Sequence, residues 1–100
     1  MTTTARLDVL PDVPTVADFV PGYEASGFAG IGAPKDTPAE IIALLNRELN
    51  AGLTDARIKA RIVELGGTVA GGTPAEFAAI IAQATEKWAK VIKFAGIKAE

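Results

Sequence analysis

The sequence predicts an α/β fold with three main helices and one or two short strands. Three observations support this fold class. A Gly-rich apolar run at residues 28–33 precedes a Pro-bounded turn, which is typical of a strand that ends in a loop. The tetrapeptide Thr-Pro-Ala-Glu, a strong helix start, occurs at residues 37–40 and again at residues 73–76. A long apolar stripe at helical spacing follows the second tetrapeptide.

Prolines and glycines punctuate residues 1–36, which we expect to be irregular but part of one compact unit with the rest of the chain. Thr15 is predicted to cap a one-turn helix, with Asp18 at its third position completing a capping box. The best strand candidate is residues 28–33. Its two glycines weaken it as a free strand and indicate close approach by another backbone or a ligand.

Residues 37–100 are expected to be mainly helical. The first helix begins with Thr37 as N-cap and Glu40 in the capping box, and it ends near Gly52. The second helix covers about residues 55–65, with an aspartate at the positive end of the helix dipole and basic side chains further on.

A short strand candidate at residues 68–70 precedes the third helix, which begins with Thr73 as N-cap and ends at Gly96 in a left-handed cap. Its apolar stripe predicts one continuous buried face over about five turns. The stripe consists of Phe77, Ile80, Ile81, Ala84, Trp88, Val91, Ile92 and Ala95. Three lysines on the opposite face are predicted to point to solvent: Lys87, Lys90 and Lys93.

Composition narrows the possible functions. The net charge of −2 provides no basic surface for nucleic acid. The chain has no Cys and no His, so it lacks thiolate chemistry, disulfides and the commonest general base and metal ligand. The loop acids Asp8, Asp12 and Asp18 do not have the spacing of a calcium-binding loop. We therefore expect no enzyme activity, no metal site and no cofactor.

No apolar run approaches the ~20 residues that span a bilayer. The first residues also lack the basic and apolar regions of a signal peptide. We therefore expect that the chain as written is not exported by the usual route.

Few residues outside the helices are candidates for binding. Each helix N-terminus offers free N–H groups to a carboxylate, but this feature is common to all helices. The glycine pairs at residues 66–67 and 71–72 match no phosphate-binding motif, so we interpret them as turns and tight packing. Tyr23 and Phe28 are aromatic residues in a Pro/Gly-rich region, where such side chains often face a cleft or a partner.

Four segments, in order, carry a resemblance to a known family: residues 10–18 (LPDVPTVAD), 21–24 (PGYE), 28–38 (FAGIGAPKDTP) and a closing stretch that includes 73–77 (TPAEF) and 88–97 (WAKVIKFAGI). Together they resemble the C-terminal third of the extracytoplasmic solute receptors of tripartite tricarboxylate transporters, the Bug family. Two positions depart from the family pattern. Phe28 replaces the usual Trp and loses the indole N–H donor. Asp36 replaces the usual Gly and takes a positive φ less freely.

The resemblance implies a fragment of a two-lobed periplasmic-binding-protein fold that closes on a small carboxylate. Residues 28–33 would be a strand that crosses between the lobes, and residues 37–100 the helical part of one lobe. Such a receptor would be periplasmic and would deliver its ligand to membrane permease subunits. Within the matching segments, our candidate ligand-binding residues are Phe28, Thr15 and Tyr23.

A lobe separated from its sheet partners exposes strand edges and an apolar face, so we expect self-association, most simply as a twofold dimer. Two interpretations stay open. The chain is a solute-binding module, or a truncated C-terminal piece of one, or it is a stand-alone self-associating interaction domain without a ligand site. An intact coding sequence upstream favours the first, and a true start at Met1 favours the second.

Overall fold

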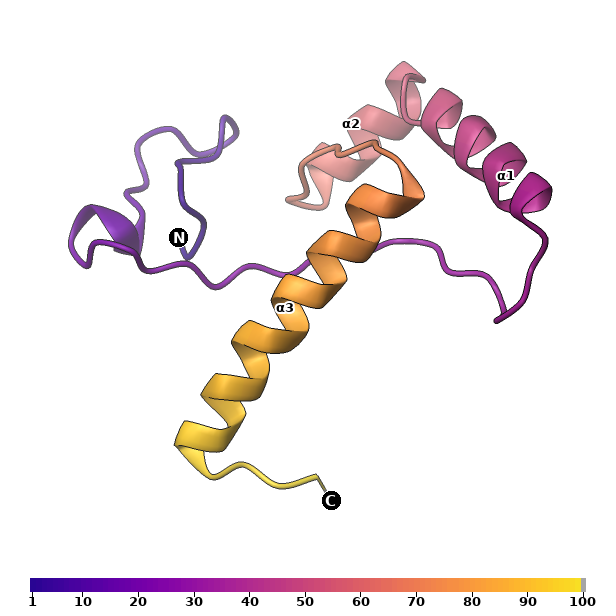
Figure 1. Cartoon of the computed structure of the whole chain (residues 1–100). Helices are drawn as coiled ribbons and strands as arrows, with labels where there is room; N and C mark the ends of the chain where they lie inside the picture. Colours follow the sequence, from indigo (N-terminus) through magenta and orange to yellow (C-terminus); the bar gives the residue numbers. More distant parts are fainter. Residues whose placement is uncertain (100) are drawn as a thin grey trace.

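The computed structural model describes residues 1–99 (Figure 1). It contains three α-helices, α1 (Ala39–Gly52), α2 (Ala56–Glu64) and α3 (Pro74–Ala95), and a one-turn 3-10 helix, η1 (Val16–Asp18). The three predicted main helices and the predicted turn of helix after Thr15 are confirmed.

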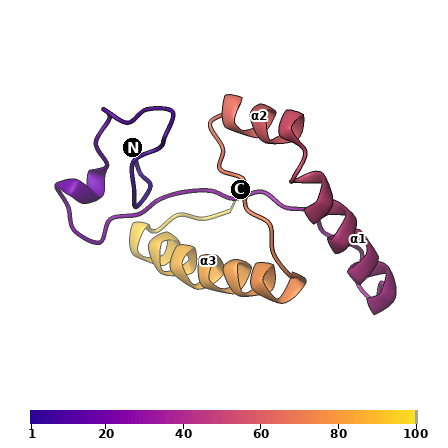
Figure 2. The same ribbon diagram turned by 90° about the horizontal axis from the view of Figure 1, so that it is seen from above.

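The strands predicted at residues 28–33 and 68–70 do not form, since residues 1–99 contain no β-strand. A strand needs a partner for its backbone groups, and neither segment has a backbone hydrogen bond to any residue in this range. Residues 28–33 nevertheless run extended between the N-terminal segment and α1 (Figure 2). The helical part of the predicted fold is thus confirmed, whereas the two-lobed α/β architecture is not.

The N-terminus of α3 forms as predicted, whereas α2 begins one residue after Asp55, which lies outside the helix as its N-cap. Asp55 caps α2, because its carboxylate accepts the N–H groups of Arg57 and Ile58 at 2.9 and 3.3 Å. Thr73 caps α3, because its hydroxyl oxygen accepts the N–H of Glu76 at 3.1 Å. Each bond satisfies a donor that has no acceptor within its helix.

Two other predicted caps are confirmed. Gly96 ends α3 with a φ of 67°, and the N–H of Ile97 donates to the carbonyl of Ile92 at 3.1 Å, as in a Schellman ending. In η1, Thr15 and Asp18 form the reciprocal capping box, with side-chain to backbone distances of 3.2 and 3.0 Å.

The start of α1 differs from the prediction. Pro38 is its N-cap, and no side chain caps the helix. The Thr37 hydroxyl instead donates to the carbonyl of Pro34 at 2.7 Å, closing the preceding turn. Asp36 in that turn has a φ of 66°, so it adopts the left-handed conformation that glycine takes more freely. The predicted cap is wrong because the Thr37 hydroxyl is bonded within the preceding turn.

The part of the chain from residue 1 to 99 has no buried hydrophobic side chain. The accessible surface is 8269 Å², whereas a compact monomer of this mass exposes about 5,400 Å². The radius of gyration is 16.6 Å, against about 13 Å for a compact chain of this length. The helices are spread around the extended segment and do not stack face to face (Figures 1 and 2).

The prediction of a continuous buried face on α3 is therefore wrong for this chain. Ile80 is 47% exposed, Trp88 39% and Ile92 46%. The helical spacing of these residues is as predicted, but no other element of residues 1–99 covers the stripe along its length. An apolar stripe of this kind is typical of a helix face that packs against another element or a partner.

Lys87 connects α3 to the N-terminal segment. Its ammonium group bonds both the carboxylate and the backbone carbonyl of Glu24. The prediction that Lys87 points freely into solvent is thus wrong, whereas Lys90 is exposed as predicted and pairs with Glu86 at 3.1 Å. None of the helices described over residues 1–99 combines the length and apolar character needed to cross a membrane.

Candidate functional site

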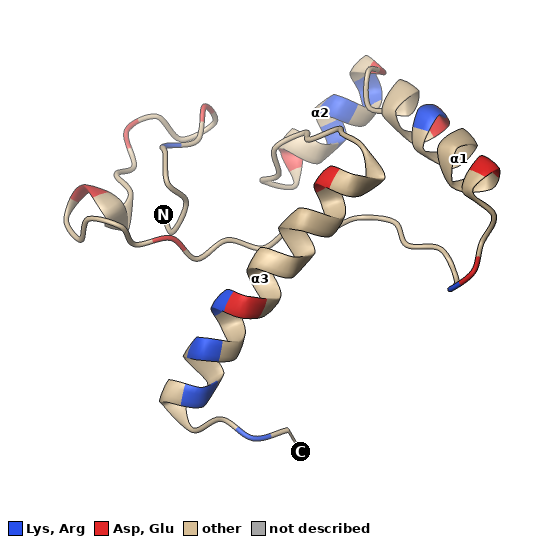
Figure 3. Cartoon of the chain, in the orientation of Figure 1, with Lys and Arg blue, Asp and Glu red and all other residues tan. Residues whose placement is uncertain are grey.

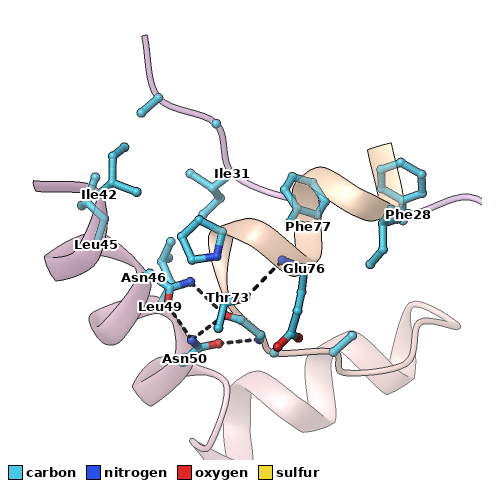
Figure 4. A pocket seen from close by; sticks show the side chains of 18 of the residues that line it. Phe28, Ile31, Ile42, Leu45, Asn46, Leu49, Asn50, Thr73, Glu76 and Phe77 are labelled. Atoms are coloured by element: carbon cyan, nitrogen blue, oxygen red, sulfur yellow. Dashed lines mark hydrogen bonds between the residues drawn. The ribbon is translucent and has the colours of Figure 1, made fainter. Parts of the chain in front are cut away.

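A pocket of about 390 Å³ lies where the extended segment passes α1 and the first turns of α3 (Figure 4). Its walls come from residues 28–33, from the inner side of α1, and from residues 70–77 with Ile80. Most of the lining is apolar. The large apolar side chains are Phe28, Ile31, Ile42, Leu45, Leu49, Phe77 and Ile80.

Two asparagines one turn apart on α1 form the polar part of the wall (Figure 4). The Nδ2 atoms of Asn46 and Asn50 each donate to the carbonyl of Gly72 at 2.9 Å. The Oδ1 atom of Asn50 accepts the N–H of Gly72 at 3.1 Å. We call this group the asparagine clamp. It fixes the turn before α3 against α1, and its groups are already engaged with the protein.

The glycine pair at residues 71–72 fits this clamp tightly, as predicted. A Cβ on Gly71 would lie 2.8 Å from Oδ1 of Asn50, and a Cβ on Gly72 would lie 2.7 Å from the Glu76 carboxylate. A side chain at Gly71 would therefore displace the Asn50 amide of the clamp, whereas one at Gly72 would meet the end of the Glu76 side chain.

Glu76 is the charged residue among those that line the pocket, and the lining includes no Lys or Arg. Charged side chains of the described residues lie instead on α2, on the C-terminal half of α3, in the loops and at other positions of α1 (Figure 3). A carboxylate ligand would thus meet a negative group and no cation here. This pocket can bind the apolar part of a small molecule, but charge neutralisation requires groups from elsewhere.

Among the predicted ligand-binding residues, Phe28 lines the pocket. Its ring packs edge-to-face on Phe77, with centroids 5.9 Å apart and planes at 90°, a favourable geometry for aromatic pairs. Phe77 was expected in the core, and it lies instead at the pocket wall. Thr15 is buried and occupied by the capping box. Thr15 and Tyr23 do not line this pocket.

Sequence reasoning missed the asparagine clamp and the Lys87 contact. A signal for the clamp was present, because Asn46 and Asn50 are spaced i, i+4 among the apolar residues of α1. The Lys87 contact joins residues far apart in sequence. Hydrogen bonds from the Lys87 ammonium, and then from the Ser26 hydroxyl, lower the pKa of the Glu24 carboxyl from its usual value.

Comparison with curated proteins places the chain among known relatives. It is 34% identical over 98% of its length to a UPF0065 protein of Bordetella bronchiseptica, and 40% identical over 96% to one of Agrobacterium vitis. It is 35% identical over 88% of its length to the protein BugT of Bordetella pertussis. The chain is a relative of the Bug family. The resemblance noted in the sequence is thus confirmed.

The match covers only part of the length of each relative. The chain spans 29% of the length of the Bordetella bronchiseptica and Agrobacterium vitis proteins and 27% of BugT. No protein-family model matches the chain, and no solved structure matches it at a significant level. The Bug relationship therefore applies to the matched residues.

Proposed function

We propose that this chain is a piece of a solute receptor of the tripartite tricarboxylate type, which binds small carboxylates in the periplasm and delivers them to membrane permease subunits. The family relationship supports the proposal. The observation that carries it is the apolar pocket beside residues 28–33, because its exposed apolar lining suits a lobe that meets further structure.

The charges that line the pocket indicate which part of a carboxylate site this chain would supply. The residues of this chain supply an apolar wall and the aromatic pair of Phe28 and Phe77. Glu76 is negative, so the donors that neutralise a carboxylate come from residues outside this chain. The chain by itself therefore provides one side of a cleft and no complete anion site.

A chimera tests this proposal. The residues of BugT that match this chain are replaced by the chain itself, and thermal unfolding is recorded with di- and tricarboxylates and acidic amino acids. A ligand at 100 times its Kd stabilises by about 2.7 kcal/mol, which is on the order of 10 °C for a small domain and several degrees for a larger one. We expect the chimera and BugT to respond to the same carboxylate, and the isolated chain to respond to none.

Two results would contradict the proposal. The first is a folded chimera that no longer responds to a carboxylate that stabilises BugT. The second is the absence of any carboxylate response in both proteins. Circular dichroism of the chimera separates lost binding from lost folding.

The second candidate function is a stand-alone interaction domain that associates with itself and has no ligand site. The exposure of large apolar side chains on all three helices favours it. Under either function, we propose that the chain performs no catalysis.

A further inference from the structure

Three contacts hold the extended segment along α3. At one end, the Lys87 ammonium bonds the carboxylate and the backbone carbonyl of Glu24. Further along the segment, the Phe28 ring packs edge-to-face on Phe77 (Figure 4). Gly30 follows, and it passes so close that an added Cβ would lie 2.3 Å from the Phe77 ring. The Phe77 ring therefore contacts both the Phe28 ring and the backbone at Gly30.

The spacing of these contacts leaves little slack in the segment. Lys87 and Phe77 are ten residues apart on α3, which is about 15 Å along a helix axis. Glu24 and Phe28 are four residues apart, and four fully extended residues span at most about 14 Å. The segment between the two contacts is thus close to its full length. A contact at one end therefore restricts where the ring at the other end can lie.

Lys87 differs from the other paired lysine of α3. Lys90 pairs with Glu86 on its own helix, and the two side chains are 76% and 72% exposed. The side chains of Lys87 and Glu24 are 40% and 31% exposed, and Glu24 also accepts a hydrogen bond from the Ser26 hydroxyl. Water screens the Lys87 pair less than the Lys90 pair, and only the Lys87 pair joins α3 to another part of the chain.

From these contacts we infer that Lys87 is a positioning residue for the aromatic wall of the pocket. By holding Glu24, it seats Phe28 and Gly30 against Phe77, and these three residues line the pocket. Lys87 and Glu24 do not line it, so a contact outside the pocket sets the shape of its wall. The consequence for solute binding rests on the proposed function, whereas the placement of the Phe28 ring does not.

A double-mutant cycle in the full chain tests the placement of the ring. Phe28→Leu removes the aromatic pair, so we expect it to raise the equilibrium constant for unfolding on the order of fivefold. In a Lys87→Met background the same substitution raises it less than about twofold, because the ring is no longer seated. Distant residues that are not linked in this way have additive effects. Urea unfolding of the four proteins gives the result.

The matched control is Lys90→Met, which removes the same charge from the same helix. In that background we expect Phe28→Leu to keep its full effect. An equal effect of Phe28→Leu in the Lys87→Met and Lys90→Met backgrounds overturns the inference. Lys87→Arg keeps a cation that can donate to both oxygens of the contact, so it restores the full effect of Phe28→Leu. Failure of this rescue likewise overturns the inference, because the lysine would then act through something other than its charge.

The chimera with BugT extends the test to the solute. In that protein we expect Lys87→Met to raise the carboxylate Kd about two- to fivefold, up to the value of a partly exposed ion pair, and Lys90→Met to leave it unchanged. A chimera that binds with the same Kd in both variants contradicts the positioning of the pocket wall. A wild-type chimera that binds no carboxylate contradicts the proposed function instead, and the cycle in the full chain then decides the role of Lys87.

Discussion

The tetrapeptide Thr-Pro-Ala-Glu occurs before both α1 and α3, and its threonine bonds differently at the two places. Before α3, the Thr73 hydroxyl accepts the N–H of Glu76 and the helix begins at Pro74. Before α1, the Thr37 hydroxyl donates back to Pro34 and the helix begins at Ala39. The four residues are identical, so their surroundings decide how each helix starts.

The surroundings differ in two respects. The turn before α3 is fixed from outside by the asparagine clamp on Gly72. The turn before α1 is closed by its own residues, with Asp36 in the left-handed conformation. Where the turn is held by another element, the Thr73 hydroxyl is available to cap the helix. Where the turn is held by its own residues, the Thr37 hydroxyl bonds within the turn and does not cap the helix.

The largest expected effect is at the clamp. Asn50→Ala removes two hydrogen bonds to Gly72 and one to Asn46, which lowers the free energy of unfolding by about 3 kcal/mol at 0.5–1.5 kcal/mol for each bond. Asn46→Ala, the control, removes its bond to Gly72 and the bond that it accepts from Asn50, and it costs about 2 kcal/mol. Urea unfolding at a fixed protein concentration measures both. Equal losses for the two variants would show that the clamp does not hold the turn in this way.

The two threonines give the next largest contrast. Thr73→Ala removes a helix cap and costs about 1 kcal/mol. Thr37→Ala removes a hydroxyl that only closes an exposed turn, and it costs about half of that or less. Thermal unfolding of the two variants side by side measures the difference. A larger loss at residue 37 than at residue 73 would contradict the assignment of the caps.

A smaller effect of opposite sign is expected at residue 36. Asp36→Gly relieves a positive φ of 66° and stabilises the chain by about 0.5 kcal/mol, because glycine adopts this conformation without steric cost but loses more entropy on folding. Gly96→Ala is the reverse control, because it places a side chain at a φ of 67° and costs about 1 kcal/mol. Destabilisation by Asp36→Gly would mean that the aspartate side chain itself supports the turn.

The smallest expected effect concerns pH and a second anchor of α3, the contact between Lys87 and Glu24. The pKa of Glu24 is lower in the folded chain than its usual value of 4.5. The carboxylate therefore contributes stability above pH 4.5, and this contribution is lost as the pH falls through the lowered pKa. Unfolding curves of the wild type and Lys87→Met are expected to converge in acid. A constant difference at every pH would exclude this linkage.

The elements that the sequence predicts correctly are those with local causes. Asp55, Thr73 and Gly96 act on backbone groups within a few residues, so their types and positions are sufficient to place the ends of α2 and α3. The family relationship was likewise accessible, because it rests on the order of short motifs over nearly the whole chain.

The features that were mispredicted depend on partners distant in sequence. Residues 28–33 have the composition of a strand, but no second strand of residues 1–99 pairs with them. The stripe on α3 has the spacing of a buried face, but its partner is equally missing from that range. For the site, Phe28 lines the pocket, and its role in ligand binding stays a prediction. Thr15 lies outside the pocket, and its buried hydroxyl accepts the N–H of Asp18 in the cap of η1, an arrangement set by the fold around it.

The chain has one tryptophan, Trp88, and it follows the lysine that anchors α3 to the N-terminal segment. The Lys87 ammonium lies 5.3 Å from the centre of the indole ring, within the range of a cation–π contact. Trp88 is also 39% exposed on the uncovered stripe. Fluorescence from this single indole therefore reports on whether the anchor is closed and whether the stripe is covered, without any added label.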